Sequence, residues 1–351
     1  MPHSSLAFPA LDPTSIFEHF RGSYGTELLT AAVGEFRLFE KLRAGPRSEP
    51  DLRRELGLED RPAVVLFTAM RAMGLLHRDA DQRLVLSPLA RDHLLEGAPF
   101  DVSAYVGLAS EAPGVKEMIA RLKSNKPAGA AEEKGAAFIY REGLESAMEH
   151  EADARRLTLA LAGRAKNVAP HLARVAPLEG VTTLLDVGGG TGLYSIACLQ
   201  RHPRLRAIVW DRPEVLKIAH EFASAHGVAD RLETRPGDMF ADAVPSADAI
   251  LLSNILHDWD VPQNRQLIKR LATTLPANGR LLIHDVFLND ALDGPLPLAL
   301  YSAALFTLTE GRAYSAVEYR TWLTEAGLTS GPVTPTLIHC GVLTGFKGDY
   351  T

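Results

Sequence analysis

The sequence predicts an α/β protein with a doubly wound, mainly parallel sheet in its C-terminal half and a helical, winged-helix domain before it. From Thr182 onward, short apolar runs alternate with helical patterns, as in parallel sheets covered by helices on both faces. Residues 50–86 show the order helix, turn, helix, hairpin. The 351 residues, 46% of them hydrophobic, suffice for two cores. We therefore expect domains 1–170 and 171–351, divided near Pro170.

The first helices are expected between Ile16 and Leu42, where apolar residues recur at helical spacing with an interruption around Gly22 and Gly25. More apolar positions occur around these helices than one core face needs. Excess apolar surface indicates a partner surface, so we expect a homodimer formed through this region.

The winged-helix pattern follows. Helices are predicted over Pro50–Leu56 and Pro62–Met73, and a hairpin joins 75–78 to 83–86. The second helix has the position of a DNA-recognition helix, but its residues 63–70 are almost all apolar. A helix that reads base edges displays Arg, Asn or Gln. Together with a formal net charge of -6, this predicts no nucleic acid partner.

Between the two domains, the stretch Lys123–Gly135 reads as a flexible surface loop, and a helical pattern resumes at Leu144 and runs with breaks to Leu172. Five parallel strands are then expected, at Thr183–Val187, Ala207–Trp210, Leu232–Thr234, Ala249–Leu252 and Arg280–His284. The tail segments Gly331–Thr336 and Leu337–Phe346 are predicted as adjacent strands, an antiparallel pair at one edge of the sheet.

Composition also narrows the environment. Cys198 and Cys340 both lie in apolar stretches, so we expect buried thiols and no disulfide framework. The N-terminal residues lack the pattern of a secretory signal, and no uncharged apolar run approaches the roughly 20 residues that span a bilayer. We therefore expect a cytoplasmic protein with no membrane partner.

The clearest local signal is an apolar strand that ends in Asp186 and runs into the glycines of 188–192. Glycines let the backbone approach a ligand closely, and the N-terminus of the following helix offers unpaired N–H donors. A dinucleotide fold would have glycine at position 193, where this chain has Leu193. Asp211 ends the second strand and can accept hydrogen bonds from two ribose hydroxyls. Mononucleosides and dinucleotides both meet that requirement.

His257 follows the fourth strand at the carboxyl edge of the sheet, where ligands of open α/β folds bind. Neutral histidine can accept a proton from a substrate. Taken alone, it also fits a solvated or capping role, and Asp258 fits a cap of the next helix. His284 alternates to the opposite face of its strand and is interpreted as packing.

These motifs resemble a known family. Asp186–Gly192 (DVGGGTG), Asp211, Gly237–Phe240 (GDMF) and His257–Trp259 (HDW) are similar to the S-adenosylmethionine-dependent small-molecule O-methyltransferases, typified by plant caffeic acid and chalcone methyltransferases and bacterial antibiotic-tailoring enzymes. The resemblance covers essentially the whole chain. It implies a Rossmann-like methyltransferase sheet with an antiparallel edge strand, an N-terminal winged-helix dimerisation domain, and S-adenosylmethionine as cofactor with S-adenosylhomocysteine as product.

The resemblance also implies which residues hold the cofactor. Asp186, Gly188 and Gly190 belong to the loop at its methionine end. Asp211 would hold the ribose, flanked by Arg212, while Asp238, Met239 and Trp259 would lie at the adenine. Plant relatives carry a Lys for the cofactor carboxylate where this chain has Ser253, so a neutral hydroxyl replaces a charge-assisted contact.

In the same way, the resemblance implies that His257 is a general base oriented by Asp285 and Glu310. A phenol near pKa 10 must lose its proton to become a good nucleophile, and an acid on the far ring nitrogen stabilises the imidazolium. Plant relatives have Glu at the Asp285 position. Asp285 alone also fits a turn residue, and Glu310 a partner of Arg312. Without a third imidazole near Glu310, no metal is expected.

The acceptor is expected to be a flat, largely apolar small molecule that bears a hydroxyl. In the predicted helix Leu296–Leu308, Tyr301, Leu305 and Phe306 either line its pocket or form plain core. Two alternatives remain: a C- or N-methyltransferase on the same scaffold, and a winged-helix regulator that senses S-adenosylmethionine. The regulator predicts salt-sensitive DNA binding.

Overall fold

The computed structural model describes residues 5–127 and 151–348, with the side chains of 151–154 and of Glu214 left aside. The chain forms two compact units. The first, which we call the sheet unit, comprises Met1–Ser15, Phe138–Phe287 and Tyr314–Thr351. The second, the helical unit, comprises Ile16–Ala137 and Leu288–Ala313.

This division differs from the contiguous domains 1–170 and 171–351 expected from the sequence. Pro170, expected near the boundary, lies inside helix α9 (Glu151–Val175). The chain also leaves the sheet unit after Phe287, adds helix α13 (Leu296–Leu308) to the helical unit and returns at Tyr314. Prolines in the sequence can indicate one boundary between two domains. They do not indicate that a later segment of the chain packs with the first domain.

The sheet has the strand order β10-β11-β7-β6-β3-β4-β5, and the five strands from β5 to β7 pair in parallel. The parallel strands are β3 Thr183–Val187, β4 Arg206–Asp211, β5 Leu232–Pro236, β6 Ala249–Ser253 and β7 Arg280–Leu288. All five predicted strands are confirmed. β7 extends beyond the predicted end at His284, because the antiparallel strand β11 (Cys340–Phe346) pairs with it from Arg280 as far as Val286, two residues past its last pair with β6.

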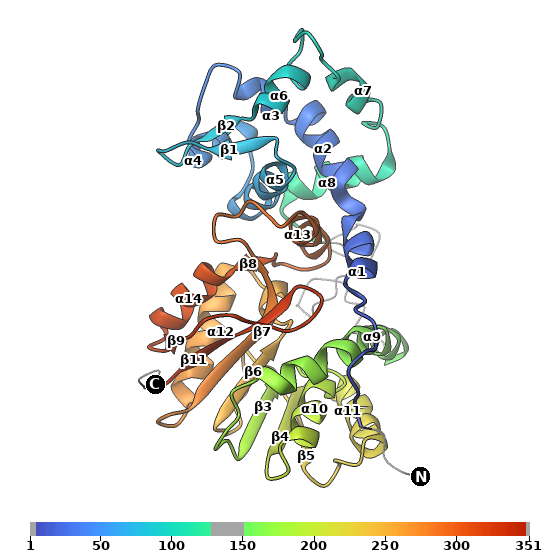
Figure 1. Cartoon of the computed structure of the whole chain (residues 1–351), viewed down its shortest axis with the longest axis vertical. Helices are drawn as coiled ribbons and strands as arrows, with labels where there is room; N and C mark the ends of the chain where they lie inside the picture. The colour runs from blue at the N-terminus through green and yellow to red at the C-terminus, as the bar shows by residue number, and fades with distance from the viewer. Residues whose placement is uncertain (1–4, 128–150, 349–351) are drawn as a thin grey trace. The chain divides into compact units, whose positions relative to one another are not determined.

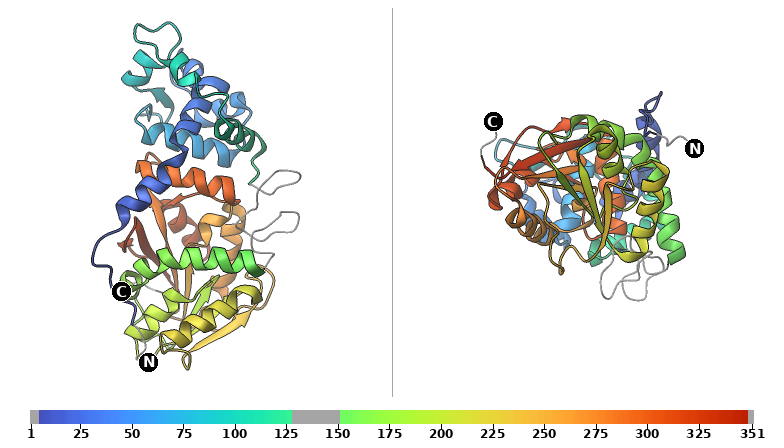
Figure 2. Two further views of the ribbon diagram at one scale, coloured as in Figure 1. Left: turned by 90° about the vertical axis from the view of Figure 1, so that its right-hand side faces the viewer. Right: turned by 90° about the horizontal axis from the view of Figure 1, so that it is seen from below.

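Helices cover both faces of this sheet, as Figure 1 shows. Helices α9, α10 (Leu193–Arg201) and α11 (Pro213–Ala225) pack together on one face, which is turned toward the viewer in the left panel of Figure 2. Helices α12 (Val261–Thr274) and α14 (Ala316–Glu325) lie on the other, where they bury the alternate residues of the central strands. The doubly wound prediction is confirmed.

The edge of the sheet is antiparallel, as predicted, but its strands are shorter than the predicted pair. β11 pairs with β7, and β9 (Thr329–Ser330) and β10 (Thr334–Pro335) pair with β11. Ile338 and His339 have positive φ angles of 56° and 60°, so the chain turns there instead of continuing as a strand. The two-residue strand β8 (Tyr314–Ser315) pairs with β7.

The helical unit contains the predicted winged helix. Helices α4 and α5 and the hairpin β1–β2 reproduce the predicted order, with Leu76 opposite Leu86. Its elements are α1 Thr14–Arg21, which begins two residues before the unit, η1 Gly22–Tyr24, α2 Gly25–Thr30, η2 Ala31–Glu35, α3 Leu38–Lys41, α4 Glu49–Leu56, α5 Asp60–Ala72, β1 Leu76–Arg78, β2 Leu84–Leu86, α6 Pro88–His93, α7 Ser103–Gly107, α8 Pro113–Ser124 and α13.

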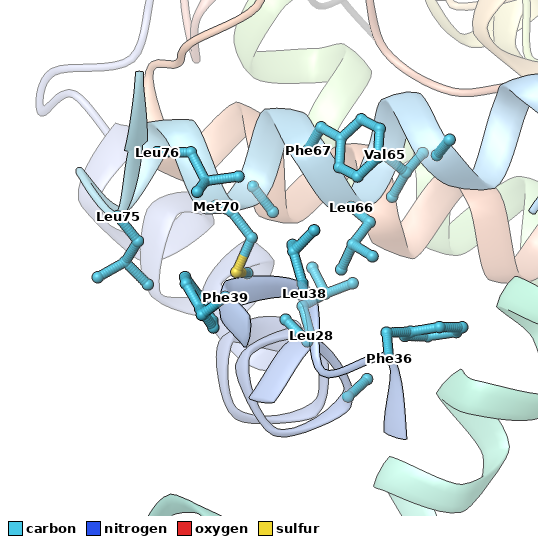
Figure 3. Close-up of a cluster of buried hydrophobic side chains, with 14 of the residues drawn as sticks. Leu28, Phe36, Leu38, Phe39, Val65, Leu66, Phe67, Met70, Leu75 and Leu76 are labelled. Atoms are coloured by element: carbon cyan, nitrogen blue, oxygen red, sulfur yellow. The ribbon is translucent and has the colours of Figure 1, made fainter. Parts of the chain in front are cut away.

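Helix α5, which occupies the position of a recognition helix, is a core helix. Leu66 and Met70 are fully buried, and Figure 3 shows them directed toward Leu28, Leu38 and Phe39. Each fully buried apolar side chain of this size stabilises the fold by roughly 1.5–3 kcal/mol. The apolar residues of this helix, which argued against recognition of DNA bases, are therefore explained by their packing in the core.

Helix α13 packs on α5 in the same core. Phe306 is fully buried in that cluster and Leu305 is buried, which agrees with the core interpretation of these residues. Tyr301 is half-buried, and the guanidinium of Arg21 lies 4.1 Å from the centre of its ring. This helix, far along the chain, thus completes the helical unit.

Two further expectations can be compared with the structure, and a third lies mostly outside its described residues. Cys198 and Cys340 are free and buried, as expected. Among the described residues, no helix is long and apolar enough to cross a membrane. Most of the predicted loop Lys123–Gly135 and the start of the helical pattern at Leu144 fall within 128–150, outside the described residues.

Candidate active site

The predicted site residues of the sheet unit gather at the carboxyl edge of the parallel strands. Because β5, β4, β3, β6 and β7 lie side by side in that order, their C-terminal ends bring together segments more than 100 positions apart in the sequence. Asp211 ends β4, the glycine loop follows β3, and His257 follows β6. This edge is where open α/β sheets bind ligands.

The loop after β3 depends on glycine. Gly188, Gly190 and Gly192 have φ angles of 64°, 58° and 69°, a region that other residues rarely adopt. Gly192 is the N-cap of α10, so the unpaired N–H groups of that helix begin at the loop. The N–H of Gly190 donates to Oδ2 of Asp211 over 2.9 Å, which links the two predicted halves of the cofactor site.

Asp186 lies beneath this loop and is completely buried. The hydroxyl of Ser195 donates to its Oδ2 over 2.7 Å, whereas its Oδ1 accepts no hydrogen bond from any described residue. Burial raises the pKa of Asp186 to about 7, despite the hydrogen bond from Ser195. A side chain at Gly189 would place its Cβ 2.7 Å from the carboxyl carbon of Asp186. The loop is thus closed down on a buried acid with spare hydrogen-bonding capacity.

The segment after β5 is also held close to the site. A Cβ at Gly237 would lie 2.2 Å from Nε1 of the buried Trp210, so only glycine fits there. The N–H of Gly237 donates to the carbonyl of Asp211 over 3.1 Å. Asp238 follows and is exposed, while Met239 is half-buried against the core of the sheet unit.

Trp259 anchors the other side of this region. It is buried, and the ring of Phe240 meets it edge-on with 4.8 Å between centroids. Its carbonyl accepts hydrogen bonds from the hydroxyl of Tyr314 (2.6 Å) and the amide of Asn264 (2.8 Å). Arg212 follows Asp211 at the start of α11, and its N–H donates to Oδ1 of Asp211 over 2.7 Å.

His257 and Asp285, which the resemblance implies as partners, form a buried pair. Nδ1 of His257 lies 2.6 Å from Oδ1 of Asp285, and both side chains are buried. The N–H of Val286 donates to the same oxygen, and the hydroxyl of Tyr319 donates to Oδ2 over 3.2 Å. Asp285 lies inside β7, so its interpretation as a turn residue is wrong.

Two opposing effects act on this histidine. Burial lowers the pKa of His257, but the nearby carboxylates of Asp285 and Asp258 outweigh it and leave the pKa above its ordinary value. Oδ1 of Asp258 lies 3.7 Å from Nε2, and burial raises the pKa of Asp258 to about 6. Asp258 does not cap α12, because the Asp260 side chain accepts the N–H of Val261 in that role.

Ser253 belongs to a buried network that the sequence did not reveal. Its hydroxyl lies 2.8 Å from Nδ1 of His284 and accepts the side-chain amide of Asn254 over 3.1 Å. Burial lowers the pKa of His284 to about 3, so this imidazole is neutral, and it is fully buried as the packing interpretation required. Arg164 of α9 donates to Oδ1 of Asn254 over 2.7 Å and to Sγ of Cys340.

Three residues of the site were therefore missed: Tyr319, Asn254 and Arg164. Asn254 alone left a weak signal, because it follows a strand end directly, and its φ of 58° is a conformation that Asn tolerates. Tyr319 and Arg164 lie on amphipathic helices, where nothing local separates a site residue from a packing residue. Their contacts form only when the sheet is assembled.

Glu310 lies in the helical unit, in the turn that follows α13. The expected role of Glu310 beside His257 consequently stays a prediction. Thr309, its neighbour, is buried and donates its hydroxyl to the carbonyl of Leu305 over 2.8 Å. Across the described part of the chain, no group of three or more His, Cys, Asp or Glu side chains is placed to hold a metal ion.

Comparison with known proteins shows what this site belongs to. Residues 136–329 match the model of an O-methyltransferase domain. Over 318 residues the chain is 35% identical to a 3-hydroxy-5-methyl-1-naphthoate 3-O-methyltransferase of Streptomyces sahachiroi, covering 90% of this chain and 89% of that relative. The chain belongs to the O-methyltransferase family.

Two further relatives of the enzyme are informative. A solved family 2 O-methyltransferase from Planctomyces limnophilus, in complex with apigenin, is 46% identical, with a TM-score of 0.90 over 99% of this chain and 100% of that one. An L-tyrosine C(3)-methyltransferase from Streptomyces lavendulae is 29% identical over 312 residues, 87% of this chain and 84% of that relative.

The enzyme uses S-adenosylmethionine, and the residues at the sheet edge fit this group. A Cβ at Gly190 would meet nothing within 4 Å, so the loop backbone is open to a ligand there, and the N–H of the same residue is bonded to Asp211. The buried Asp186 carries an oxygen without a partner among the described residues, which is left to accept a hydrogen bond from a ligand. A nucleoside that also carries positive charge suits such a donor and acceptor set.

Proposed function

We propose that the enzyme transfers a methyl group to the hydroxyl of an aromatic or polyketide-like small molecule, with His257 as general base. The hydrogen bond between His257 and Asp285, buried at the carboxyl edge beside the glycine loop, is the observation that supports it most directly. In this proposal Asp285 and Glu310 orient the imidazole, as the family resemblance implies.

When bound, S-adenosylmethionine supplies an electrophilic methyl group on a sulfonium. The role of His257 is to accept the hydroxyl proton at Nε2 as the acceptor oxygen bonds to the methyl carbon and the carbon–sulfur bond breaks. Nδ1 faces Asp285 over 2.6 Å, which favours the tautomer with the proton on Nδ1 and the lone pair on Nε2. The carboxylate then stabilises the imidazolium that forms.

Holding the cofactor falls to the other predicted residues. We assign the methionine end to Asp186, Gly188 and Gly190, the ribose to Asp211 with Arg212 at its flank, and the adenine to Asp238, Met239 and Trp259. The Ser253 hydroxyl is engaged by His284 and Asn254, and the guanidinium of Arg164 reaches the same asparagine. We propose that Arg164 supplies the positive charge that a lysine at position 253 would have provided for the cofactor carboxylate.

The substrate class is argued from the relatives. One acts on a hydroxynaphthoate and another was crystallised with apigenin, and both molecules are flat phenols. The L-tyrosine C(3)-methyltransferase gives a second candidate, methyl transfer to carbon. An acceptor that is already nucleophilic needs no general base, so the two candidates differ in their dependence on His257.

The test is to assay His257→Ala with labelled cofactor and a panel of phenols that includes apigenin and 3-hydroxy-5-methyl-1-naphthoate. We expect kcat to fall by roughly 100-fold or more, as general-base removal usually causes, with cofactor affinity unchanged. His220→Ala, at an exposed position on α11, is the control and should behave as wild type. Unchanged turnover in His257→Ala would show that His257 is not the general base. Mass spectrometry of the product identifies the methylated atom.

Calorimetry tests the cofactor assignments separately. Arg164→Met should weaken S-adenosylmethionine binding by roughly 10-fold, because a charge-assisted hydrogen bond contributes about 1.5–3 kcal/mol. Decarboxylated S-adenosylmethionine should bind wild type and Arg164→Met equally. Equal loss with both ligands would show that Arg164 does not contact the carboxylate.

A further inference from the structure

A buried arginine in the helical unit converges on the turn that carries Glu310. Arg61, in the first turn of α5, is 4% exposed. Its Nη1 donates to the carbonyls of Thr309 (2.9 Å) and Gly311 (3.2 Å), the residues on either side of Glu310. Its Nε and Nη2 donate to the side-chain and main-chain oxygens of Asn125, at 2.8 and 2.9 Å.

The same turn is fixed from within. The Thr309 hydroxyl accepts the N–H of Gly311 over 3.1 Å and donates to the carbonyl of Leu305. The guanidinium of Arg61 also lies 4.6 Å from the centre of the Phe306 ring, in the last turns of α13. The backbone on both sides of Glu310 is therefore held by one planar cation and one hydroxyl.

Burying a guanidinium is costly unless its donors are satisfied, so its presence in a mainly apolar core calls for a reason. Packing alone would be served by leucine or methionine. The rigid fork of arginine can bond oxygens on several sides at once, whereas lysine offers three donors from a single point. The geometry uses this fork to join α5, the end of α8 and the Glu310 turn.

We propose that Arg61 is a positioning residue for methyl transfer, which holds the Glu310 turn so that the carboxylate can orient the general base. This inference rests on the proposed role of Glu310. It gives part of the winged helix a role in catalysis, because the helix in the recognition position carries, at its N-terminal end, the residue that sets the acid.

Helix α5 also supplies a matched control. Arg71, at its other end, is 8% exposed and donates to the carbonyls of Ala291 (2.5 Å) and Leu292 (3.1 Å), in the turn before α13. It is thus a second buried arginine on the same helix that secures the opposite end of α13, away from Glu310. A general effect of loosening α13 should appear equally in substitutions at both arginines.

The experiment compares Arg61→Lys, Thr309→Val, Arg71→Lys and Glu310→Gln in the full chain, using the phenol of the panel that wild type methylates fastest. We expect Arg61→Lys, Thr309→Val and Glu310→Gln each to lower kcat at neutral pH by roughly 10-fold or more. They should also move the acidic limb of the kcat profile to lower pH, because in the proposed role the Glu310 carboxylate raises the pKa of His257, and its loss or displacement lowers that pKa. Arg71→Lys should do neither, and the calorimetric Kd for S-adenosylmethionine should stay within about twofold of wild type in all four.

The outcomes separate the two proposals. If Glu310→Gln behaves as wild type, the role of Glu310 fails and this inference falls with it. If Glu310→Gln is impaired while Arg61→Lys and Thr309→Val match Arg71→Lys, only the positioning role is overturned. In the double variant Arg61→Lys/Glu310→Gln the two losses should not add. Full additivity would show that Arg61 acts elsewhere, and melting temperatures identify any variant that fails to fold.

Discussion

At the scale of single residues, the chemistry of the site depends on how His257 is held. Burial by itself would lower the pKa of its imidazole and make it a weaker base, whereas the carboxylate of Asp285 raises the pKa and also fixes the ring. Tyr319 donates to the second oxygen of the same carboxylate, so Asp285 is oriented in its turn. A shorter acid than the glutamate of plant relatives therefore reaches the histidine directly.

This arrangement predicts a specific pH dependence. Because His257 must be neutral to act as a base and its pKa is raised, kcat/KM of the wild type should fall as pH decreases through a value above 6.5, the ordinary pKa of histidine. In Asp285→Asn the stabilising charge is lost, so the acidic limb should move to lower pH by about one unit or more, while the maximal rate also falls. Asp230→Asn, at an exposed site, is the control. An unshifted limb in Asp285→Asn would contradict the assignment.

At the scale of elements, the cofactor edge is built from tight turns that follow parallel strands. The loop after β3 needs positive φ angles at three glycines, while the turn after β5 needs glycine for a different reason, the approach to Trp210. Both turns are bonded to Asp211, one through its side chain and one through its carbonyl. Displacing either turn should therefore disturb Asp211 and the cofactor edge of the sheet.

Gly237→Ala tests this dependence. The new Cβ would lie 2.2 Å from Nε1 of Trp210, which is buried and cannot move away. We expect a loss of unfolding free energy of about 1–3 kcal/mol, as in overpacked cores, and weaker S-adenosylmethionine binding by calorimetry. Gly163→Ala is the matched control, since Gly163 is exposed within α9 and a Cβ there meets nothing within 4 Å. That control should gain about 0.5–1 kcal/mol, and equal behaviour of the two variants would refute the explanation.

At the scale of the whole molecule, the helical unit leaves large apolar side chains in solvent. They include Ile16, Phe20, Phe100, Tyr105 and Leu108, each between 66% and 78% exposed. Large apolar patches on a folded protein mark interaction sites. We propose that these side chains form such a patch, and that it is the homodimer surface expected from the sequence.

Sedimentation or mass photometry checks the homodimer. Wild type should give twice the 38.1 kDa chain mass at micromolar concentration. Phe20→Asp should weaken the assembly by at least 10-fold, because burying an unpaired carboxylate in an apolar interface is unfavourable. Glu18→Gln, in the same helix, should leave the mass unchanged. A monomeric mass for wild type would end the proposal.

The amino-acid sequence by itself determined the features that depend on neighbouring residues. Alternating apolar runs predicted the five parallel strands, the glycines after Asp186 predicted a ligand loop, and the position of His257 after a strand predicted a group at the carboxyl edge. These signals are local, because strand period, turn conformation and strand direction follow from a few adjacent residues.

Only the tertiary structure decided which distant residues meet. The partners of His284, the contact of Arg164 with Asn254 and the hydrogen bond from Tyr319 to Asp285 all join different elements. Helix α13 likewise belongs to the helical unit, although in the sequence it comes between two segments of the sheet unit. Such contacts form when a whole face of one helix or sheet packs against another. The order of residues within one element does not indicate which other element will pack against it.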